Sequence, residues 1–363
     1  MGELRVRIAE DVRVPLGGPW FEDLKVGQVV DDAPPLTLTS AHALLHQSLT
    51  GDRLRLPLDH VLSAAVTGRD APLAHPLLVT NVAIGQTTAL TQRVKANLFY
   101  RGLVLECPVF LGDTLETTTE VVGLRQNPLK PGRPATGLAA LRCTTWNQDG
   151  QRVLDFYRCP MLPLRDPEGV TGHNDDFAGI PEDLDDDRLV AAVGGWDLAA
   201  FRARTGSALR AGDLVPGTIY ALEFRDTVTG ACELARATLN LAEAHTDARR
   251  SPYGQRLVYG GHTISLAGAA VSRALPGLVT ILGWRACDHA GPVFEGDVLR
   301  TEVAVEAVTP LAARGPGGDP QGDGGLVDLR ARVWVDRPEE GAPPGAPTGE
   351  GLVLDWRLVG LMA

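Results

Sequence analysis

The residues best suited to chemistry lie close together in the second half of the chain. His245 follows Asn240 by five residues, a spacing that lets the two side chains lie across one helical turn and converge on one water. A histidine can take and return a proton near neutral pH, whereas an asparagine amide only orients the water because it cannot take a proton. The pair therefore predicts acid/base chemistry that depends on His245.

A glycine-rich segment follows this pair. Tyr259-Gly260-Gly261 stands directly before a stretch that we expect to form a buried helix. Glycine lets a substrate approach the backbone closely, and the N–H groups at the start of a helix are free to bind an oxyanion. Two nearby histidines, His262 and His289, are candidates for lining the same pocket or, alternatively, for a place in the core or on the surface.

Each candidate also has a purely structural interpretation. His245 fits a hydrogen-bonded histidine at a helix edge, and Asn240 fits a helix N-cap. Asp247 fits a residue that caps or braces a helix, and the glycines fit a tight turn. The spacing alone leaves these alternatives open.

Length and composition limit the class of protein. The chain has 363 residues, of which 44% are apolar, and its formal net charge is −11. These values favour about two domains and exclude a disordered chain, a collagen and a disulfide scaffold. The sequence has no basic stripe to neutralise nucleic-acid phosphates and no apolar run long enough to cross a membrane. We therefore expect neither nucleic acid nor a membrane as a partner.

The cysteines and the missing motifs narrow the chemistry further. Five cysteines are scattered along the chain without a C-x-x-C pair, which is typical of buried thiols in a reducing compartment. The charged N-terminal segment lacks the apolar core of a secretion signal, so we expect a cytoplasmic protein. There is no metal-ligand cluster, Gly-rich phosphate loop or G-x-S-x-G elbow, so metal-dependent, nucleotide-hydrolysing and serine-hydrolase mechanisms have no support.

An internal duplication organises the elements that must position the candidates. The segment P-V-F-x-G-D-x-L occurs at residues 108–115 and again at 292–299, with six identities at an offset of 184. G-L-x-x-L-R-x-x-x-W recurs from 137 to 325, V-L-D from 153 to 353, and D-L-x-x-G from 23 to 213. Four matches in the same order indicate two homologous halves.

The duplication fixes the expected domain boundaries. We place one domain at residues 1–164 and its homologue at residues 191–363, joined by residues 165–190. The joining segment carries −7 of the net charge, from nine acidic residues and two arginines. Its charge, with its prolines and glycines, is typical of a solvated linker.

Each half shows the same succession of elements. A stretch rich in small apolar residues, 77–90 in the first half and 262–274 in the second, predicts a helix buried on all sides. Four β-branched runs follow it, at 97–106, 114–124, 137–147 and 153–162, with equivalents at 279–288, 297–308, 326–335 and 352–361. One buried helix wrapped by an antiparallel sheet is an α+β architecture.

Several motifs resemble those of the MaoC-type acyl dehydratases and (R)-specific enoyl-CoA hydratases. They are F-E-D-L-x-V-G at 21–27, the helix openings His75-Pro76 and Tyr259-Gly260, and above all N-L-A-E-A-H-T-D at 240–247. The resemblance covers nearly the whole chain and extends to the long members that include mesaconyl-CoA and methylmalyl-CoA hydratases. It implies a double hot-dog, two tandem domains that each wrap a long helix in an antiparallel sheet, with the sheets joined edge to edge.

The family's hydratase motif reads Asp-x-Asn-Pro-x-His-x-Asp, and the second half resembles it better. There His245 and Asp247 match the His and the final Asp, while Asn240 replaces the catalytic Asp. In the first half Asp52 matches that Asp, but Pro57 replaces the His. The resemblance therefore implies one site per chain, in the second half, and a degenerate first half that is structural or binds the acyl chain.

The resemblance also implies roles for individual residues. His245 is the expected general base or acid, Asn240 orients the water, and the Gly260 amide polarises the thioester carbonyl. From their own chemistry and position we also expect neighbouring residues to bind the substrate, with Arg256 as a candidate to meet a phosphate of coenzyme A. These residues are Tyr259, Gly261, His262, Arg256 and Asp247. The expected partner is an acyl-CoA thioester, no cofactor is implied beyond its coenzyme A, and a homo-oligomer is left open.

Three functions fit these residues. The motifs favour an acyl-CoA hydratase or dehydratase, which adds or removes water across the double bond of an α,β-unsaturated acyl thioester. Hot-dog folds also host thioesterases, for which Glu243 is the available carboxylate. A non-catalytic acyl-CoA-binding protein is the third alternative, because the first half is degenerate and Asn240 replaces the family's Asp.

Overall fold

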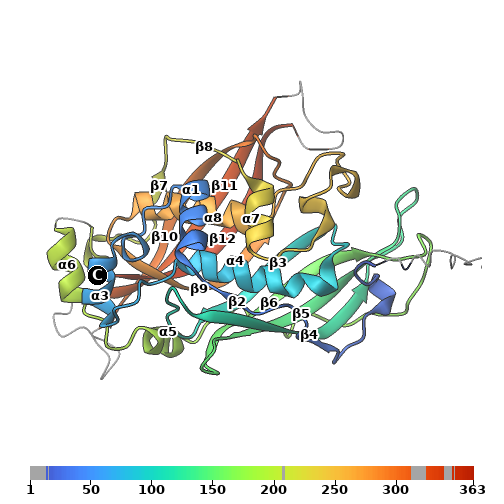
Figure 1. The fold of residues 1–363 in the computed structure, drawn as a ribbon. Coiled ribbons are helices and arrows are strands. Elements are labelled where there is room, and N and C mark those ends of the chain that lie inside the picture. The colour runs from blue at the N-terminus through green and yellow to red at the C-terminus, as the bar shows by residue number, and fades with distance from the viewer. Residues whose placement is uncertain (1–13, 15, 207–208, 312–323, 339–345, 347) are drawn as a thin grey trace, which may run out of the picture.

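One antiparallel sheet runs through both halves of the protein (Figure 1). The computed structural model describes residues 14, 16–206, 209–311, 324–338, 346 and 348–363. The strands of the first half are β1 (Val29–Val30), β2 (Leu36–Thr37), β3 (Ala96–Leu105), β4 (Thr114–Gln126), β5 (Thr136–Trp146) and β6 (Arg152–Pro163). Those of the second half are β7 (Ile219–Ala221), β8 (Asp226–Thr227), β9 (Leu278–His289), β10 (Val298–Pro310), β11 (Gly325–Arg337) and β12 (Gly349–Met362).

Helices and short 3₁₀ turns fill the space beside this sheet. The α-helices are α1 (Ser40–Thr50), α2 (Arg55–Leu58), α3 (His60–Thr67), α4 (Pro76–Gln86), α5 (Asp186–Ala192), α6 (Leu198–Thr205), α7 (Ala231–Ala237) and α8 (Gly260–Ala274). The 3₁₀ turns are η1 (Phe21–Asp23), η2 (Thr87–Thr91), η3 (Ala211–Asp213), η4 (Glu243–His245) and η5 (Ala248–Arg250). The two long helices and the eight long strands lie where the repeated pattern predicts them.

The strand order is symmetrical about the middle of the sheet. It reads β1-β4-β5-β6-β3-β9-β12-β11-β10-β7, with β2 on β4 and β8 on β10. At the centre β3 pairs antiparallel with β9, from Phe99 opposite Asp288 to Val104 opposite Gly283. The sheets of the two halves are thus joined edge to edge, and neither β3 nor β9 is left as an open edge.

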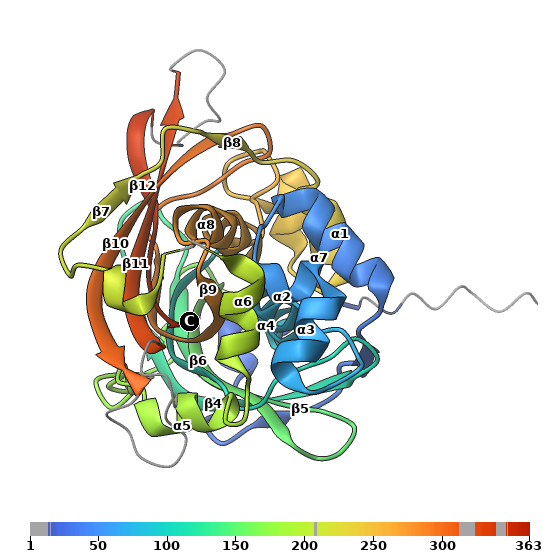
Figure 2. The same cartoon turned by 90° about the vertical axis from the view of Figure 1, so that its left-hand side faces the viewer.

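The helices α4 and α8 lie side by side within the curve of the sheet (Figure 2). Every residue of α4 is buried, and so are the residues of α8 from Gly261 to Ser272. A Cβ on Gly268 would lie 2.2 Å from the Leu77 side chain, so this glycine lets the helices approach closely. Between them Asn81 donates a hydrogen bond to Ser265 Oγ over 2.9 Å, which satisfies two buried polar groups.

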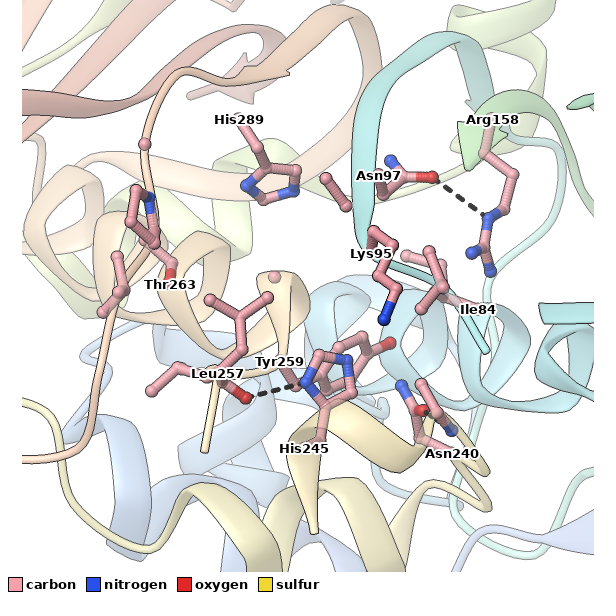
Figure 3. A pocket seen from close by; sticks show the side chains of 18 of the residues that line it. Ile84, Lys95, Asn97, Arg158, Asn240, His245, Leu257, Tyr259, Thr263 and His289 are labelled. Carbon is pink, nitrogen blue, oxygen red and sulfur yellow. Dashed lines mark hydrogen bonds between the residues drawn. The ribbon is translucent and has the colours of Figure 1, made fainter. Parts of the chain in front are cut away.

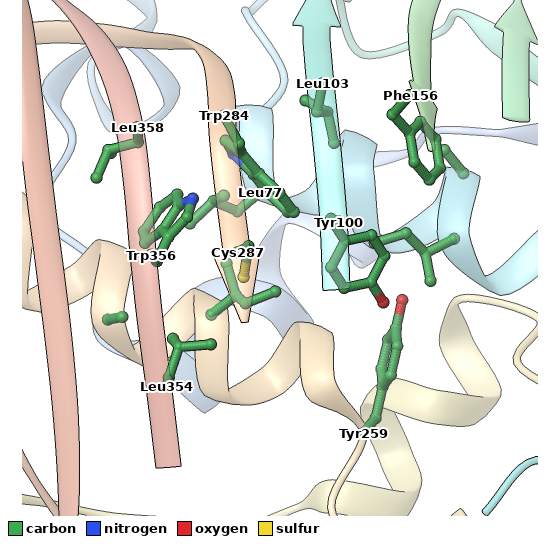
Figure 4. Close-up of a cluster of buried hydrophobic side chains, with 14 of the residues drawn as sticks. Leu77, Tyr100, Leu103, Phe156, Tyr259, Trp284, Cys287, Leu354, Trp356 and Leu358 are labelled. Atoms are coloured by element: carbon green, nitrogen blue, oxygen red, sulfur yellow. The ribbon is translucent and has the colours of Figure 1, made fainter. Parts of the chain in front are cut away.

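A row of aromatic side chains packs across the junction of the halves (Figure 4). The ring of Tyr100 on β3 meets Trp284 on β9 edge to face at 5.8 Å between centroids. Trp284 in turn meets Trp356 on β12 at 5.5 Å, again edge to face. All three rings are at most 2% exposed, so they stabilise the junction by apolar burial as well as by ring geometry.

The structure corrects the interpretation of residues 165–190 as a solvated linker. Most side chains from 165 to 183 are exposed, as expected. Leu184 and Leu189 are buried, however, because α5 packs against β3 and β9. Acidic residues near α5 also pair with the sheet, where Asp186 lies 3.3 Å from Arg285. The end of the segment therefore packs against the junction of the two sheets. The sequence did not predict this packing, because the many acidic residues outweigh the two buried leucines in the composition of the segment.

The packing of α5 leads to a stability prediction. Leu189→Ala leaves a cavity under α5 and should lower the free energy of unfolding by about 2–5 kcal/mol. Val190→Ala, the matched control on the half-exposed neighbour, should cost about 1 kcal/mol or less. Urea unfolding monitored by tryptophan fluorescence measures both. A loss at Leu189 no larger than about 1 kcal/mol would mean that its burial under α5 adds little stability.

Candidate active site

A cavity of about 240 Å³ lies between the two halves (Figure 3). The first half lines it with residues from α4, η2, β3 and β6, and the second half with residues from the Asn240–His245 loop, the start of α8 and the end of β9. Its polar side chains include Thr88, Lys95, Asn97, Tyr100, Arg158, Asn240, His245, Tyr253, Tyr259, Thr263 and His289. One complete cavity therefore needs both halves.

His245 is held as a neutral base. It ends η4, and its Nδ1 lies 2.8 Å from the carbonyl oxygen of Leu257. A carbonyl only accepts, so Nδ1 carries the proton and Nε2 keeps its lone pair. The pKa of His245 is lowered to about 4, chiefly by burial and to a smaller extent by the positive charge of Arg158, against the raising effect of the Leu257 hydrogen bond. The ring is therefore unprotonated at neutral pH and able to accept a proton.

Asn240 lies in a turn whose preceding residue has a left-handed backbone conformation. Leu239, directly before it, has a φ of +60°, a left-handed conformation that costs energy for a branched side chain. The side-chain oxygen of Asn240 accepts from the N–H of Ala242 over 2.9 Å, and Leu241 N–H donates to Thr88 Oγ1 over 2.8 Å. Both bonds orient the Asn240 amide at the cavity wall.

A glycine on α4 makes room for the loop that carries Asn240. A Cβ on Gly85 would lie 1.7 Å from the carbonyl oxygen of Thr238. Only glycine therefore lets this loop of the second half rest directly on the helix of the first half. Sequence analysis did not single out Gly85, since its importance depends on a contact between the halves.

Gly260 provides an amide at the cavity wall. It is the first residue of α8, so its N–H has no acceptor within the helix. A Cβ at this position would lie 2.6 Å from His289 Nε2, so the glycine leaves the space in front of that amide open. Tyr259, the preceding residue, lines the same cavity and donates from its hydroxyl to the carbonyl oxygen of Asn81 over 3.0 Å.

His289 joins these residues from the end of β9. The residue is partly buried, and its buried Nε2 atom has no hydrogen-bond partner in the described part of the chain. The pKa of His289 is lowered to about 4, chiefly by desolvation of the ring and to a smaller extent by the positive charge of Arg158. A neutral imidazole with an unused nitrogen thus faces the cavity beside Gly260.

The structure places four of the predicted binding residues outside the cavity. Asp247 caps η5 and pairs with Arg249 at 3.1 Å, and Arg256 pairs with Glu295 at 3.2 Å. His262 is 0% exposed and projects from α8 into the core near His46, while Gly261 packs against Asn81 and Tyr259. Spacing along the chain did not show which way these residues face. Asn240, His245, Tyr259 and Gly260 are brought together.

Sequence analysis missed the polar contribution of the first half. Lys95 lines the cavity from the turn before β3, Asn97 from β3 and Arg158 from β6. The repeat holds the signal that would have found them. In the first half Tyr100 on β3 lies opposite Arg158 on β6, and in the second half the equivalent Trp284 on β9 lies opposite Leu358 on β12. An arginine therefore stands where the second half has a buried leucine.

The equivalent position in the first half holds no comparable cavity. A space of about 30 Å³ remains there, against Leu73, Pro76 and Ile281, and it is closed by Val193 and Trp196 from the segment after α5. Such a volume holds about one water. Residues that directly follow the joining segment thus fill the space that the second half keeps open.

A carboxylate survives at this closed position. Asp52 lies 3.3 Å from His75 Nε2, and His75 Nδ1 accepts from the N–H of Leu77. Asp52 occupies the place of Asn240 and His75 that of Tyr259, but Pro57 stands in place of His245. The first half therefore keeps the family's Asp as a buried structural group and lacks the base.

Comparisons with known proteins place the chain in a family. It is 30% identical over 363 residues to the β-methylmalyl-CoA dehydratase of Chloroflexus aurantiacus, covering 95% of this chain and 97% of that one. It is 31% identical over 371 residues to the mesaconyl-CoA hydratase of Cereibacter sphaeroides, covering 94% and 98%. The chain belongs to the MaoC-like dehydratases. No family model matches the sequence.

Solved structures confirm the fold of this MaoC-like dehydratase. A conserved hypothetical protein of Mycobacterium tuberculosis, described as a double hot-dog, superimposes with a TM-score of 0.83 at 46% identity over 96% of this chain and all of that one. A structure described as a MaoC domain dehydratase of Chloroflexus aurantiacus gives a TM-score of 0.80 at 28% identity, over 95% and 97%. The predicted α+β double hot-dog is confirmed.

Two further findings concern the described residues of this MaoC-like dehydratase. No group of three or more His, Cys, Asp or Glu side chains among them is arranged to hold a metal ion. None of their helices has the length and apolar character needed to span a membrane.

The state of His245 is testable in the protein without ligand. NMR of ¹⁵N-labelled histidine, assigned by loss of one signal in His245→Gln, should show His245 protonated at Nδ1 and neutral down to about pH 5. Its titration should centre near pH 4, because burial disfavours the charged ring. The exposed His60 serves as an internal reference. A His245 titration near 6.5 would contradict the buried neutral base.

Proposed function

We propose that this protein adds water across, or eliminates water from, the α,β double bond of a short-chain acyl-CoA thioester. The observation that carries this proposal is His245, which is fixed as a neutral base by Leu257 in a cavity shared with Asn240 and the amide of Gly260. The names of the curated relatives, a CoA-thioester dehydratase and a CoA-thioester hydratase, support the same reaction class. The cavity of about 240 Å³ favours a short acyl group.

The geometry supports a mechanism with one proton-carrying residue. A water held by the Asn240 amide gives a proton to His245 Nε2 while its oxygen bonds to the β-carbon. The electrons of the double bond move toward the thioester oxygen, which accepts from the Gly260 N–H. The imidazolium then returns the proton to the α-carbon. Because Asn240 cannot carry a proton, His245 performs both transfers.

A thioesterase receives less support from the site. Its candidate carboxylate, Glu243, lies 3.3 Å from Arg250 and faces a separate surface depression. No Asp or Glu of the described residues lines the cavity. A binding-only protein would not need the tautomer of His245 to be fixed with Nε2 available.

The free cysteines support a cytoplasmic location, which is part of the proposal. All five cysteines are free thiols, and four of them are buried, which fits the reducing environment of the cytoplasm. The site residues suffice for hydration without a cofactor beyond the coenzyme A of the substrate. Self-association of the chain stays a prediction.

Replacing the base tests the reaction. His245→Gln should lower kcat/KM for enoyl-CoA hydration by about 10²–10⁴-fold, because it removes the base that takes the proton from the water held by Asn240. The assay follows loss of the conjugated enoyl-thioester absorbance, and His60→Gln is the control on an exposed histidine. Release of free thiol without a hydration product would favour the thioesterase. No turnover of any enoyl-CoA by the folded wild type would refute the proposal.

The glycine at the start of α8 gives a second test. Gly260→Ala should lower kcat/KM by about 10²-fold, because the added Cβ meets His289 and displaces the thioester from the amide. Gly212→Ala is the control, since a Cβ there meets nothing within 4 Å. Circular dichroism verifies that both variants fold. Full activity of Gly260→Ala would remove this amide from the mechanism.

A further inference from the structure

His289 lines the cavity but has no role in the mechanism given above. It is the last residue of β9, and its ring points from the end of that strand toward the cavity (Figure 3). Its buried Nε2 has no hydrogen-bond partner in the part of the chain that the structure describes. Buried polar atoms are almost always paired, because an unpaired one has lost its water without replacement. An unpaired atom beside a cavity is therefore suited to bind a group that the ligand brings.

The first residue of α8 lies directly against this ring. A Cβ built on Gly260 would be 2.6 Å from His289 Nε2 and 2.7 Å from its Cε1. Because a Cβ lies about 2.5 Å from the backbone nitrogen of its own residue, Nε2 and the Gly260 nitrogen are at most about 5 Å apart. Two N–H groups that share one acceptor oxygen stand about 4–6 Å apart. One oxygen of a ligand can therefore accept from both groups.

Aromatic packing fixes the orientation of the His289 ring. The ring meets Tyr100 on β3 edge to face, with 5.9 Å between the two centroids. Tyr100 is 2% exposed and packs in turn against Trp284. The aromatic row at the junction therefore holds the imidazole in place and leaves its Nε2 without a bond. A donor that is fixed before the substrate binds needs no reorganisation during the reaction.

The His289 ring is uncharged at neutral pH. Its pKa is lowered to about 4, chiefly by desolvation and to a smaller extent by the charge of Arg158. Lys95 lines the same cavity and no Asp or Glu of the described residues does, so no carboxylate there favours an imidazolium. A neutral imidazole carries one N–H. An oxygen bound beside Nε2 favours the tautomer with the N–H at that nitrogen, since a lone pair there would repel it.

The first half of the chain acts as an internal control. In the repeat His289 corresponds to Leu105 and Gly260 to Pro76, both at the offset of 184. Leu105 and Pro76 line the closed space of about 30 Å³. A leucine side chain has no hydrogen-bond donor, and a proline has no backbone N–H. Both donors are thus present at the open cavity and both are missing at the closed position, so packing of the fold does not account for them.

We propose that the Nε2–H of His289 and the N–H of Gly260 donate together to the thioester oxygen, which makes His289 a catalytic residue. This inference rests on the proposed function, because it concerns the same thioester. As the water oxygen bonds to the β-carbon, the electrons of the double bond move toward the thioester oxygen, and both donors stabilise the charge that develops there. His289 keeps its proton throughout, so both proton transfers stay with His245. The same two hydrogen bonds serve the elimination of water, which passes through the same transition state.

Three substitutions at this one position test the role of Nε2. His289→Leu, which introduces the residue of the first half, should lower kcat by about 10²–10³-fold for the enoyl-CoA that the wild type hydrates fastest, because one oxyanion donor is lost. KM should change less than about threefold, since the donor acts mainly in the transition state. His289→Gln places an amide N–H close to the position of Nε2 and should be at least about tenfold faster than His289→Leu. His289→Asn, whose amide lies close to the position of Nδ1, should be as slow as His289→Leu.

Infrared spectroscopy tests the hydrogen bond without any turnover. The probe is butyryl-CoA labelled with ¹³C at the thioester carbonyl, a saturated ligand that cannot be hydrated. A hydrogen bond weakens the C=O bond and lowers its stretching frequency. The band of the bound thioester should therefore lie at lower wavenumber in the wild type than in His289→Leu, with His289→Gln between them. His60→Gln, on an exposed histidine, should give the wild-type band and the wild-type kcat.

The outcomes separate the possibilities. Equal losses of kcat in His289→Gln and His289→Leu would make His289 a carrier of protons and overturn the proposal. Wild-type kcat in His289→Leu, or the same carbonyl band in that variant and the wild type, would also overturn it. A carbonyl band that depends on His289, without hydration of any enoyl-CoA, would support the donor and refute the proposed function.

Thermal unfolding distinguishes a structural role for His289. The midpoint for His289→Leu should stay equal or rise, because an unpaired buried nitrogen is replaced by the residue that the first half has at this position. A fall of many degrees in all three variants, with equal losses of kcat and an unchanged carbonyl band, would assign His289 to packing alone and overturn the proposal.

Discussion

The pairing of β3 with β9 is the interaction on which the rest of the structure depends. It joins the two halves into one sheet, brings α4 against α8 and places the end of β9 beside the start of β3, whose other neighbour is β6. The cavity exists only because of this junction, since its base comes from one half and its cations from the other. The aromatic packing of Tyr100 on Trp284 stabilises the junction directly behind the site. Stability and function therefore share one region.

The two halves have kept one fold while their equivalent positions have diverged. Around the open cavity stand His245, Asn240 and Arg158, and at the closed one Pro57, Asp52 and Leu358 take their places. The closed position retains the carboxylate but has no base and no space for a substrate. A catalytic residue type by itself is thus poor evidence for a site, because a base, a donor and a volume must coincide.

Much of the fold could be predicted from the sequence, because repeats, buried small-residue helices and β-branched runs are local signals. Asn240, His245, Tyr259 and Gly260 were found because they lie close together along the chain. Arg158 was not, since it is about ninety residues from this cluster and meets it only through strand pairing. Arg256 and Asp247 were misplaced because exposed residues near a motif also fit simple surface ion pairs. The two buried leucines of the joining segment were hidden by their acidic neighbours.

The fusion of two unequal halves has an evolutionary consequence. In a symmetrical dimer of identical chains, any substitution that adjusts one site also enters the other, so chemistry and selectivity change together. Here His245, Asn240 and Gly260 line the cavity from the second half, and Lys95 and Arg158 line it from the first. Substitutions on β3 and β6 can therefore change one wall of the cavity while the Asn240–His245 loop and the start of α8 stay as they are. A duplicated chain of this kind can diversify its substrates by mutating one copy alone.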